Sequence, residues 1–375
     1  MSTADFLDKL LDGAELECVP LEEVATIKHG RDWKHLNEGD IPVYGSGGIM
    51  GYVDDYSYDK PTVLIPRKGS ITNIFYVETP LWNVDTIYYT EIDEAQMLPK
   101  YFYHFICTID MMSLDTGSGR PSLTQAILNR IQIPIPCPND PEKSLAIQRE
   151  IVRILDTFTE LTAELTAELT ARKTQYKHYR DQLLTFCEDV VEWKTLGEIT
   201  RIRTGQSINK TMIAANPGKY PVINSGREPL GYFDQWNTDN DPIGITSRGA
   251  GVGSVTWRDG KYFRGNLNYS VTIKEPKVLN VRFLYHTLEQ FQPQIKQLCT
   301  YDGIPALNAG NLVDLTIPLP NLEEQIRIAT ILDKFDTLTT SLSEGLPREI
   351  ELREKQYAYY RALLLSFPKP HDMAA

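Results

Sequence analysis

The sequence has no long apolar run, no recognisable leader and no paired cysteines. None of its apolar stretches approaches the ~18 residues that a membrane-spanning helix needs. Its first residues lack a basic stretch followed by an apolar one, so we expect no signal peptide. The five cysteines are scattered and form no CxxC pair, which is typical of reduced thiols in a cytoplasmic protein.

Catalytic and metal-binding motifs are absent as well. The six histidines have no HExxH or other ligand spacing, so we expect no metal ion. The glycine-rich residues 45–51 and 249–254 fit neither GxGxxG nor a P-loop. There is no GxSxG elbow, no Pro-Pro-Tyr/Phe motif of the amino-methyltransferase type and no nuclease carboxylate cluster. The sequence therefore predicts a chain without catalytic residues and without a cofactor of its own.

Positive charge is scarce and unevenly distributed. The formal net charge is −12. Residues 20–140 carry nine basic and sixteen acidic side chains, whereas residues 194–320 carry fourteen basic and ten acidic ones. If DNA is a ligand, the attraction for its phosphates must come from local clusters or from partner subunits.

The chain does contain an internal repeat with a period of about 180 residues. Four segments of the first half return in the same order in the second: IPVYGSGGIMGY (41–52) as YPVINSGREPLGY (220–232), IQIPIP (131–136) as LTIPLP (315–320), QREIVRILDTF (148–158) as QIRIATILDKF (325–335), and RKTQYKHYRDQLLTF (172–186) as REKQYAYYRALLLSF (353–367). The sequence therefore predicts two copies of one plan.

Each copy begins with a stretch rich in Gly, Pro, Tyr and β-branched residues, which predicts a strand-rich domain of mixed α+β (α/β) class with short helices. An IPxP segment in extended conformation ends the domain, and a long helix follows from about Leu145 or Glu323. We predict five parts: an N-terminal segment that completes the repeat (1–19), a first globular domain (20–140), a central helical spacer (141–193), a second globular domain (194–320) and a C-terminal helical spacer (321–375).

The helical segments have coiled-coil spacing. Between Ile151 and Leu183, eight of ten a and d heptad positions are apolar or aromatic. The run ELTAELTAELTA (160–171) places leucines four residues apart, and Pro347 should kink or restart the second helix. A pseudo-two-fold would make the two helices antiparallel partners. A disordered linker, or two unrelated surface helices, are the alternatives.

Three pairs of polar, glycine-rich turns recur at matched places: 44–48 with 223–228, 65–70 with 245–250, and 116–124 with 300–308. Glycine lets the backbone approach a phosphate, and arginine can bind phosphate or guanine with two hydrogen bonds. From these turns we take as candidate DNA-binding residues Tyr44, Ser46, Arg67, Lys68, Ser70, Ser118, Arg120, Ser122, Asn224, Ser225, Arg227, Ser247, Arg248 and Tyr301. The alternative is that they form tight turns with solvated arginines.

The duplicated plan resembles the specificity subunit of type I restriction–modification enzymes. The residues that carry this resemblance are GRPSLT…IQIPIPCP, GIPALN…LTIPLPNLEEQ and ILDKF…REKQYAYYRALLLSF, within a match over roughly residues 10–368. The TAEL repeat further resembles the IC subfamily. The resemblance implies two target-recognition domains separated by two antiparallel helices, each domain reading one half of a split sequence in double-stranded DNA.

The resemblance also implies partners, in the cytoplasm of a bacterium or archaeon. Two modification subunits would bring S-adenosylmethionine and methylate adenine, and two restriction subunits would bring ATP, magnesium, translocation and cleavage. We expect the helices to dock the modification subunits through Phe158, Leu165, Tyr176, Tyr179, Phe335, Tyr357 and Tyr360. The alternative functions are a non-DNA coiled-coil scaffold or adaptor that holds two protein-binding domains, and a cryptic enzyme.

Overall fold

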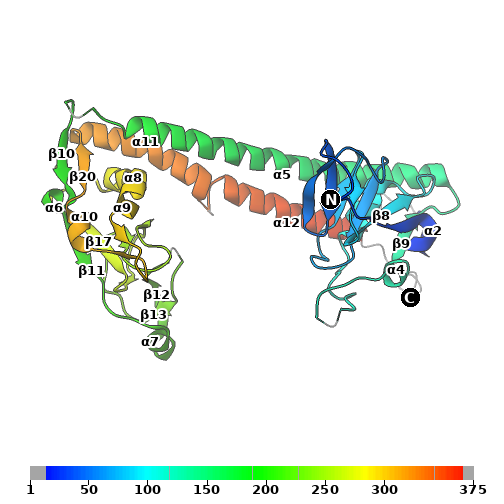
Figure 1. Cartoon of the computed structure of the whole chain (residues 1–375), viewed down its shortest axis with the longest axis horizontal. Helices are drawn as coiled ribbons and strands as arrows, with labels where there is room; N and C mark the ends of the chain where they lie inside the picture. The colour runs from blue at the N-terminus through cyan, green and yellow to red at the C-terminus, as the bar shows by residue number, and fades with distance from the viewer. Residues whose placement is uncertain (1–13, 118, 188, 227, 342, 366–375) are drawn as a thin grey trace. The chain divides into compact units, whose positions relative to one another are not determined.

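The computed structural model describes residues 14–365 apart from residues 118, 188, 227 and 342 (Figure 1). The chain divides into two units. One contains Met1–Leu165 and Glu349–Ala375, and the other contains Thr166–Arg348. Helix α5 (Pro141–Leu183) belongs to both and is continuous. The five domain boundaries drawn from the sequence stay a prediction.

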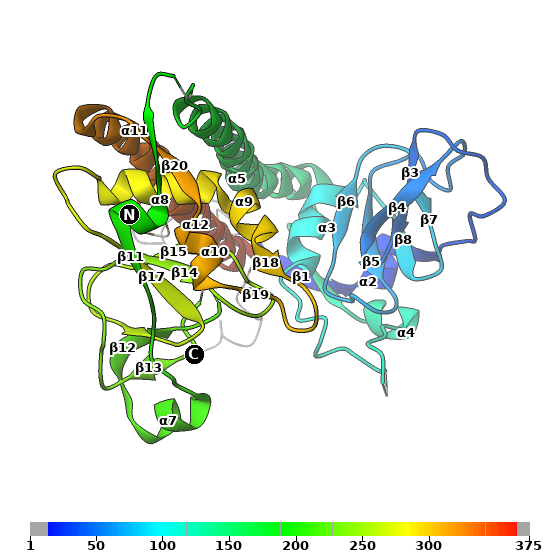
Figure 2. The same ribbon diagram turned by 60° about the vertical axis from the view of Figure 1, so that its left-hand side comes forward.

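The first unit is built on a four-stranded antiparallel sheet. Its strands are ordered β2 (Ala25–His29), β8 (Ile87–Ile92), β5 (Thr62–Pro66) and β6 (Phe75–Val77). A three-stranded sheet places β3 (Ile41–Gly45) between β4 (Gly48–Val53) and β7 (Trp82–Asn83). The first IPxP segment forms β9 (Gln132–Pro136), which pairs with β1 (Leu16–Pro20). The helices are α2 (Leu21–Val24), α3 (Pro99–Ile106) and α4 (Gln125–Leu128), and Figure 2 shows α3 beside β5 and β6.

The second unit repeats the three sheets of the first and adds a two-stranded hairpin. Its four-stranded sheet is ordered β11 (Thr200–Thr204), β17 (Asn268–Ile273), β14 (Ile243–Thr246) and β15 (Val255–Trp257). Its three-stranded sheet places β12 (Pro217–Ile223) between β13 (Tyr232–Phe233) and β16 (Phe263–Arg264). The second IPxP segment forms β20 (Thr316–Leu319), paired with β10 (Glu192–Thr195), and a hairpin joins β18 (Cys299–Thr300) to β19 (Ala306–Leu307). The helices are α6 (Leu196–Ile199), α7 (Lys210–Ala215), α8 (Val281–Gln290), α9 (Gln292–Gln297) and α10 (Ala309–Val313).

These matched sheets confirm the predicted fold class and the internal repeat. The central strands β5 and β14 are buried along their whole length, which explains why they contain no charged residue. Both IPxP segments are strands, as expected for residues whose prolines favour extended backbone.

In each unit a pair of antiparallel helices completes the core. Leu155 of α5 and Leu364 of α12 (Leu346–Leu365) belong to the same buried cluster, and Phe158 stacks on Tyr360 with ring centroids 5.1 Å apart. The two helices therefore run antiparallel in this unit. In the second unit, Tyr179 of α5 stacks on Phe335 of α11 (Leu322–Thr340) at 5.4 Å.

The second helical segment is interrupted. Helix α11 ends at Thr340 and α12 begins at Leu346, so Pro347 lies in the first turn of α12. A proline is tolerated there because the first N–H groups of a helix have no partner within it, whereas deeper in a helix it would remove a hydrogen bond. The predicted restart at Pro347 is confirmed, and the second helix is not one continuous element.

A buried glutamine fixes each globular domain to its helix. Gln148 of α5 is fully buried; its Oε1 accepts from the N–H of Leu98 at 2.9 Å and its Nε2 donates to the carbonyl of Gln96 at 2.8 Å. Gln325 of α11 makes the same two bonds, to Asn280 and Val278, at 2.8 and 3.0 Å. In each unit, a single side-chain amide therefore bonds one backbone N–H and one backbone carbonyl of the segment that precedes α3 or α8.

Replacing Gln148 with alanine should lower the free energy of unfolding of the first unit by about 1–3 kcal/mol, because it leaves two backbone groups without partners. Gln132→Ala is a matched control. That side chain is exposed and bonds only the nearby carbonyl of Arg130, so a change within about 0.5 kcal/mol is expected. Urea denaturation of the full chain measures both, and equal effects would show that Gln148 does not fix the domain.

Candidate nucleic-acid interface

The three turns predicted in the first unit lie together. The N–H of Gly69 donates to the carbonyl of Pro121 at 3.0 Å, and the N–H of Leu123 donates to the carbonyl of Arg67 at 2.9 Å. Asn73 Nδ2 donates to the carbonyl of Ser46 at 3.1 Å. The turn after β5 is therefore bonded on one side to the 116–124 loop and on the other to the β3–β4 hairpin.

The second unit joins its second and third turns in the same way. The N–H of Gly249 donates to the carbonyl of Pro305 at 2.9 Å, and the N–H of Leu307 donates to the carbonyl of Ser247 at 2.8 Å. The Asn224 Oδ1 accepts from the N–H of Leu267 at 2.9 Å. The backbone bonds that connect the second and third turns are thus identical in the two units.

A glycine with positive φ stands at a matched position in the two arrangements. Gly69 and Gly249 occupy matched positions with φ of +87° and +95°, a region that residues with a Cβ rarely adopt. The positive φ turns the chain directly after Lys68 or Arg248. The two basic side chains therefore occupy equivalent positions in the two units.

The candidate residues differ in accessibility. Lys68, Ser70, Arg120, Arg248 and Tyr301 are exposed, whereas Tyr44, Ser46, Arg67, Ser122, Asn224 and Ser225 are half-buried. Ser247 is 7% exposed, so only its backbone is placed to contribute to the turn. Ser118 and Arg227 lie outside the described residues. The role of these residues in binding DNA stays a prediction.

Asp115 organises the third loop of the first unit and was not predicted. Its Oδ1 accepts from the N–H groups of Gly117 at 2.8 Å and Ser122 at 2.7 Å, and these bonds hold the pKa of the carboxyl below its usual range. An aspartate two residues before a glycine is a sequence signal for such a turn. The carboxylate here shapes the loop that presents Arg120.

A polar cluster beneath the loops joins each domain to the helices. In the first unit, Asp156 Oδ2 accepts from Lys100 Nζ at 2.9 Å, and Asp156 Oδ1 lies 3.0 Å from His104 Nε2. A carboxylate only accepts, so Nε2 of the neutral ring carries the proton and Nδ1 accepts from the Tyr357 hydroxyl at 3.0 Å.

The second unit has the same cluster with arginine in place of lysine. Asp333 Oδ1 lies 2.7 Å from both Arg282 Nε and His286 Nε2, and His286 Nδ1 lies 3.4 Å from the Tyr176 hydroxyl. Sequence reasoning singled out the two tyrosines but missed the other members. The matched spacing of Lys100 with His104 and of Arg282 with His286 was the available signal.

The aromatic residues expected to dock partner subunits also pair the helices with each other. Besides the two stacks described above, Tyr176 stacks on Phe335 at 6.1 Å, and Tyr357 bonds His104. Leu165 is half-buried, and Tyr179 is 37% exposed. Their docking role stays a prediction.

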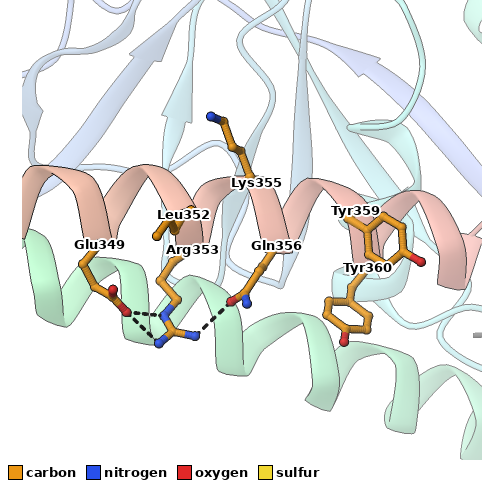
Figure 3. A pocket seen from close by; sticks show the side chains of 7 residues that line it. All are labelled: Glu349, Leu352, Arg353, Lys355, Gln356, Tyr359 and Tyr360. Carbon is orange, nitrogen blue, oxygen red and sulfur yellow. Dashed lines mark hydrogen bonds and ion pairs between the residues drawn. The ribbon is translucent and has the colours of Figure 1, made fainter. Parts of the chain in front are cut away.

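Helix α12 carries a groove of about 410 Å³ along its outer turns (Figure 3). Arg353 lies across it, with Nε bonded to Glu349 at 2.8 Å and Nη1 bonded to Gln356 at 2.9 Å. Leu352 and Tyr359 line it and are 39% and 53% exposed. In the second unit, Arg172 makes the same bonds to Glu168 and Gln175 on α5, at 2.6 and 2.8 Å.

Within the described part of the chain, no group of three or more His, Cys, Asp or Glu side chains could hold a metal ion. In the same residues, no helix is both long and apolar enough to cross a membrane.

Comparisons with known proteins agree with the duplicated geometry. A family model described as the type I restriction modification DNA specificity domain matches residues 14–172 and again residues 189–352. The chain is 37% identical to the EcoR124I/EcoR124II specificity subunit of Escherichia coli over the full length of both. A putative specificity subunit of Haemophilus influenzae is 34% identical, over 96% of this chain and 98% of its own.

The chain belongs to this specificity family. The type I S subunit of M. genitalium, a solved structure, has the same fold, with a TM-score of 0.69 over 96% of this chain and 98% of its own at 18% identity. The resemblance drawn from the sequence is thereby confirmed for the specificity family. The narrower resemblance to the IC subfamily stays a prediction.

The polar clusters of this specificity protein should respond differently to acid. Burial holds the pKa of His104 below its ordinary value of 6.5, although its bond to Asp156 acts in the opposite direction. Burial acts to raise the pKa of Asp333, but hydrogen bonds from His286 and Arg282 outweigh it and lower that pKa.

We expect the first unit to lose stability as the pH falls below about 6.5. In that range His104 becomes protonated in the unfolded chain, whereas its lower pKa keeps it neutral in the folded chain. The slope should be at most about 1.4 kcal/mol per pH unit for one proton. The contribution of Asp333 is present above its ordinary value of 3.8 and is lost only as the pH falls through its lower folded value.

Thermal unfolding between about pH 7.5 and 5.5 measures this slope, which spans the ordinary histidine pKa. His104→Gln should remove it, whereas His178→Gln, at an exposed position of α5, should leave it unchanged. An unaltered slope in His104→Gln would assign the acid sensitivity to other groups.

Proposed function

We propose that this chain selects the DNA sequence on which a type I restriction–modification complex acts, each globular domain reading one half of a bipartite duplex target. The observation that carries the proposal is the duplicated junction of the second and third turns. The same backbone bonds join these two turns in both units, while the side chains that the turns present differ. Two domains that recognise different DNA sequences need this combination of a shared backbone arrangement and different exposed side chains.

The chemistry of the turns suits phosphate and base contacts. Arg67, Lys68, Arg120 and Arg248 supply positive charge, and Gly69 and Gly249 provide the positive φ that turns the chain directly after Lys68 and Arg248. Arginine and lysine bind phosphates and the O6 and N7 atoms of guanine, and polar side chains such as Asn224 read base edges.

Assembly with partner subunits is part of the proposal. Two modification subunits, carrying S-adenosylmethionine, would dock on the helices through the aromatic residues named above and the α12 groove. Two restriction subunits would supply ATP hydrolysis, with magnesium, and cleavage. The long helices and their polar clusters support this assignment of roles, because the clusters fix each globular domain to the helix on which a partner would dock.

The acidic first domain favours a second candidate, a protein-binding adaptor. A gel-shift assay separates the two, because the specificity subunit should bind its target sequence tightly only when the modification subunits are present. Equal affinity of the assembled complex for every duplex, or association with protein alone at any salt concentration, would favour the adaptor.

Replacing Arg67 and Lys68 with alanine should weaken DNA binding by the assembled complex and flatten its salt dependence. Each lost phosphate contact reduces the slope of log K against log salt by about 0.9. Lys60→Ala is a matched control, an exposed lysine of the same domain outside the turns. The proposal for this turn is wrong if both variants give the same slope as the unaltered protein.

Deleting Glu168 to Ala171 should shorten the untouched spacer between half-sites by about one base pair. Four helical residues span ~6 Å and a base pair rises ~3.4 Å, and slight bending absorbs the remainder. The repeat preserves its own contacts, because Glu164 then stands four residues before Arg172, where Glu168 now binds it at 2.6 Å.

Mapping of methylated adenines by long-read sequencing gives both half-sites and their spacing. The half-site bases should stay the same. Altered bases with the old spacing would show that this segment does not set the length.

A further inference from the structure

Each unit exposes apolar side chains in or directly beside its three turns, in places where solvent alone would favour polar ones. In the first unit, Ile49 and Met50 of the β3–β4 hairpin are 51% and 58% exposed. In the second, Tyr301 and Ile304 of the β18–β19 hairpin are 59% and 70% exposed. Single exposed apolar residues are ordinary, but an apolar pair at or directly beside the tip of a hairpin, here called an apolar tip, is a candidate binding surface.

A β-bulge exposes the pair in the first unit. The register of β3 with β4 passes from Val43 opposite Gly51 to Tyr44 opposite Ile49, so Met50 is an extra residue. In a regular strand, successive side chains alternate between faces, whereas a bulge re-aims one of them. The thioether of Met50 lies over Gly45, where a Cβ would clash with it. The bulge and the glycine together keep both apolar side chains accessible.

The second unit presents its apolar pair on a different loop. Gly303, with φ of +85°, turns the chain between Tyr301 and Ile304. The Tyr301 hydroxyl donates to the carbonyl of Lys296 at 3.3 Å, which fixes the ring at the base of the loop and leaves Ile304 at its tip. The matched loop of the first unit presents Arg120 instead.

Both apolar tips adjoin the basic turn of their unit. The 116–124 and 300–308 loops pair with that turn through the bridges Lys68 to Ser122 and Arg248 to Ala306. In the first unit the hairpin touches the turn from its other side, since a Cβ on Gly69 would lie 3.3 Å from Ser46 Oγ. Each unit therefore places an apolar tip beside a cation able to hold a phosphate.

We propose that Ile49 with Met50, and Ile304, are apolar wedges that enter a base step of duplex DNA and unstack it. This rests on the proposed function, and it adds a means of selection that requires no hydrogen bond to a base. Proteins that bend DNA insert Ile, Leu, Met or Phe between base pairs while basic residues hold the adjacent backbone. Because pyrimidine–purine steps unstack most easily, the wedges favour sequences with such a step at a fixed place in each half-site.

Permanganate oxidation tests the proposal, since it attacks thymines that have lost their stacking. The sample is the full chain in complex with its modification subunits and a duplex that carries its mapped target. At base steps without thymine, the fluorescence of 2-aminopurine placed in the step measures the loss of stacking instead. Thymines opposite the methylated adenine are left out, because the modification subunits act there. The unaltered complex should show one reactive step in each half-site.

Ile49→Ala with Met50→Ala should lose the reactive step in one half-site and keep the other, and Ile304→Ala should give the reverse. Met112→Ala and Met212→Ala are matched controls, exposed methionines outside the turns, and should keep both. The slope of log K against log salt should not change in the wedge variants, because no phosphate contact is removed.

Unchanged reactivity in the wedge variants, or no reactive step in the unaltered complex, would overturn the wedges while sequence-specific binding still supported the proposed function. Loss of modification subunits from the variants in gel filtration, with reactivity intact, would show that the apolar tips contact protein. Failure of the unaltered complex to prefer its target would instead contradict the proposed function itself.

Discussion

A single carboxylate in each unit connects the reading domain to the helix that supports it. Asp156 and Asp333 each accept from a histidine buried beneath them and from one lysine or arginine of the same short helix. Removing the aspartate would leave the Nε2 of a buried histidine without this partner, which costs more than the bond contributes. Together with the buried glutamine nearby, the carboxylate fixes both the position and the rotation of α3 or α8.

The position of the turns follows from this connection, whereas the interior of the domains is free to differ. Asn83 in β7 bonds the Ser57 hydroxyl and the carbonyl of Ile87, and the matched residue in β16 is the buried Arg264, which bonds Asn268 and the carbonyl of Asp241. Amide and guanidinium fill equivalent places with different networks. The backbone bonds at the turns are nevertheless the same, so the frame is common while core and surface vary.

The features that the sequence predicted well are those that depend on local chemistry. The matched turns, the extended IPxP strands and the restart at Pro347 follow from glycine, proline and periodicity within a few residues. The polar clusters were missed because their members are 52 and 47 residues apart, and only the folded chain brings them together. Ser247 is among the candidate DNA-binding residues, yet its side chain is buried, because the direction of one side chain in a turn depends on packing that no local pattern encodes.

The acidic composition is compatible with DNA recognition when the turns combine electrostatic contacts with phosphates and apolar contacts with bases. Under the proposed function, a few cations on the turns hold phosphates locally, but the surrounding carboxylates weaken any general attraction for DNA. Apolar contacts with base steps are insensitive to salt and add selectivity without adding positive charge. Under the proposed function, a chain of this kind binds random duplex weakly by itself and depends on its partners for affinity, so that sequence selection and binding strength reside in different subunits.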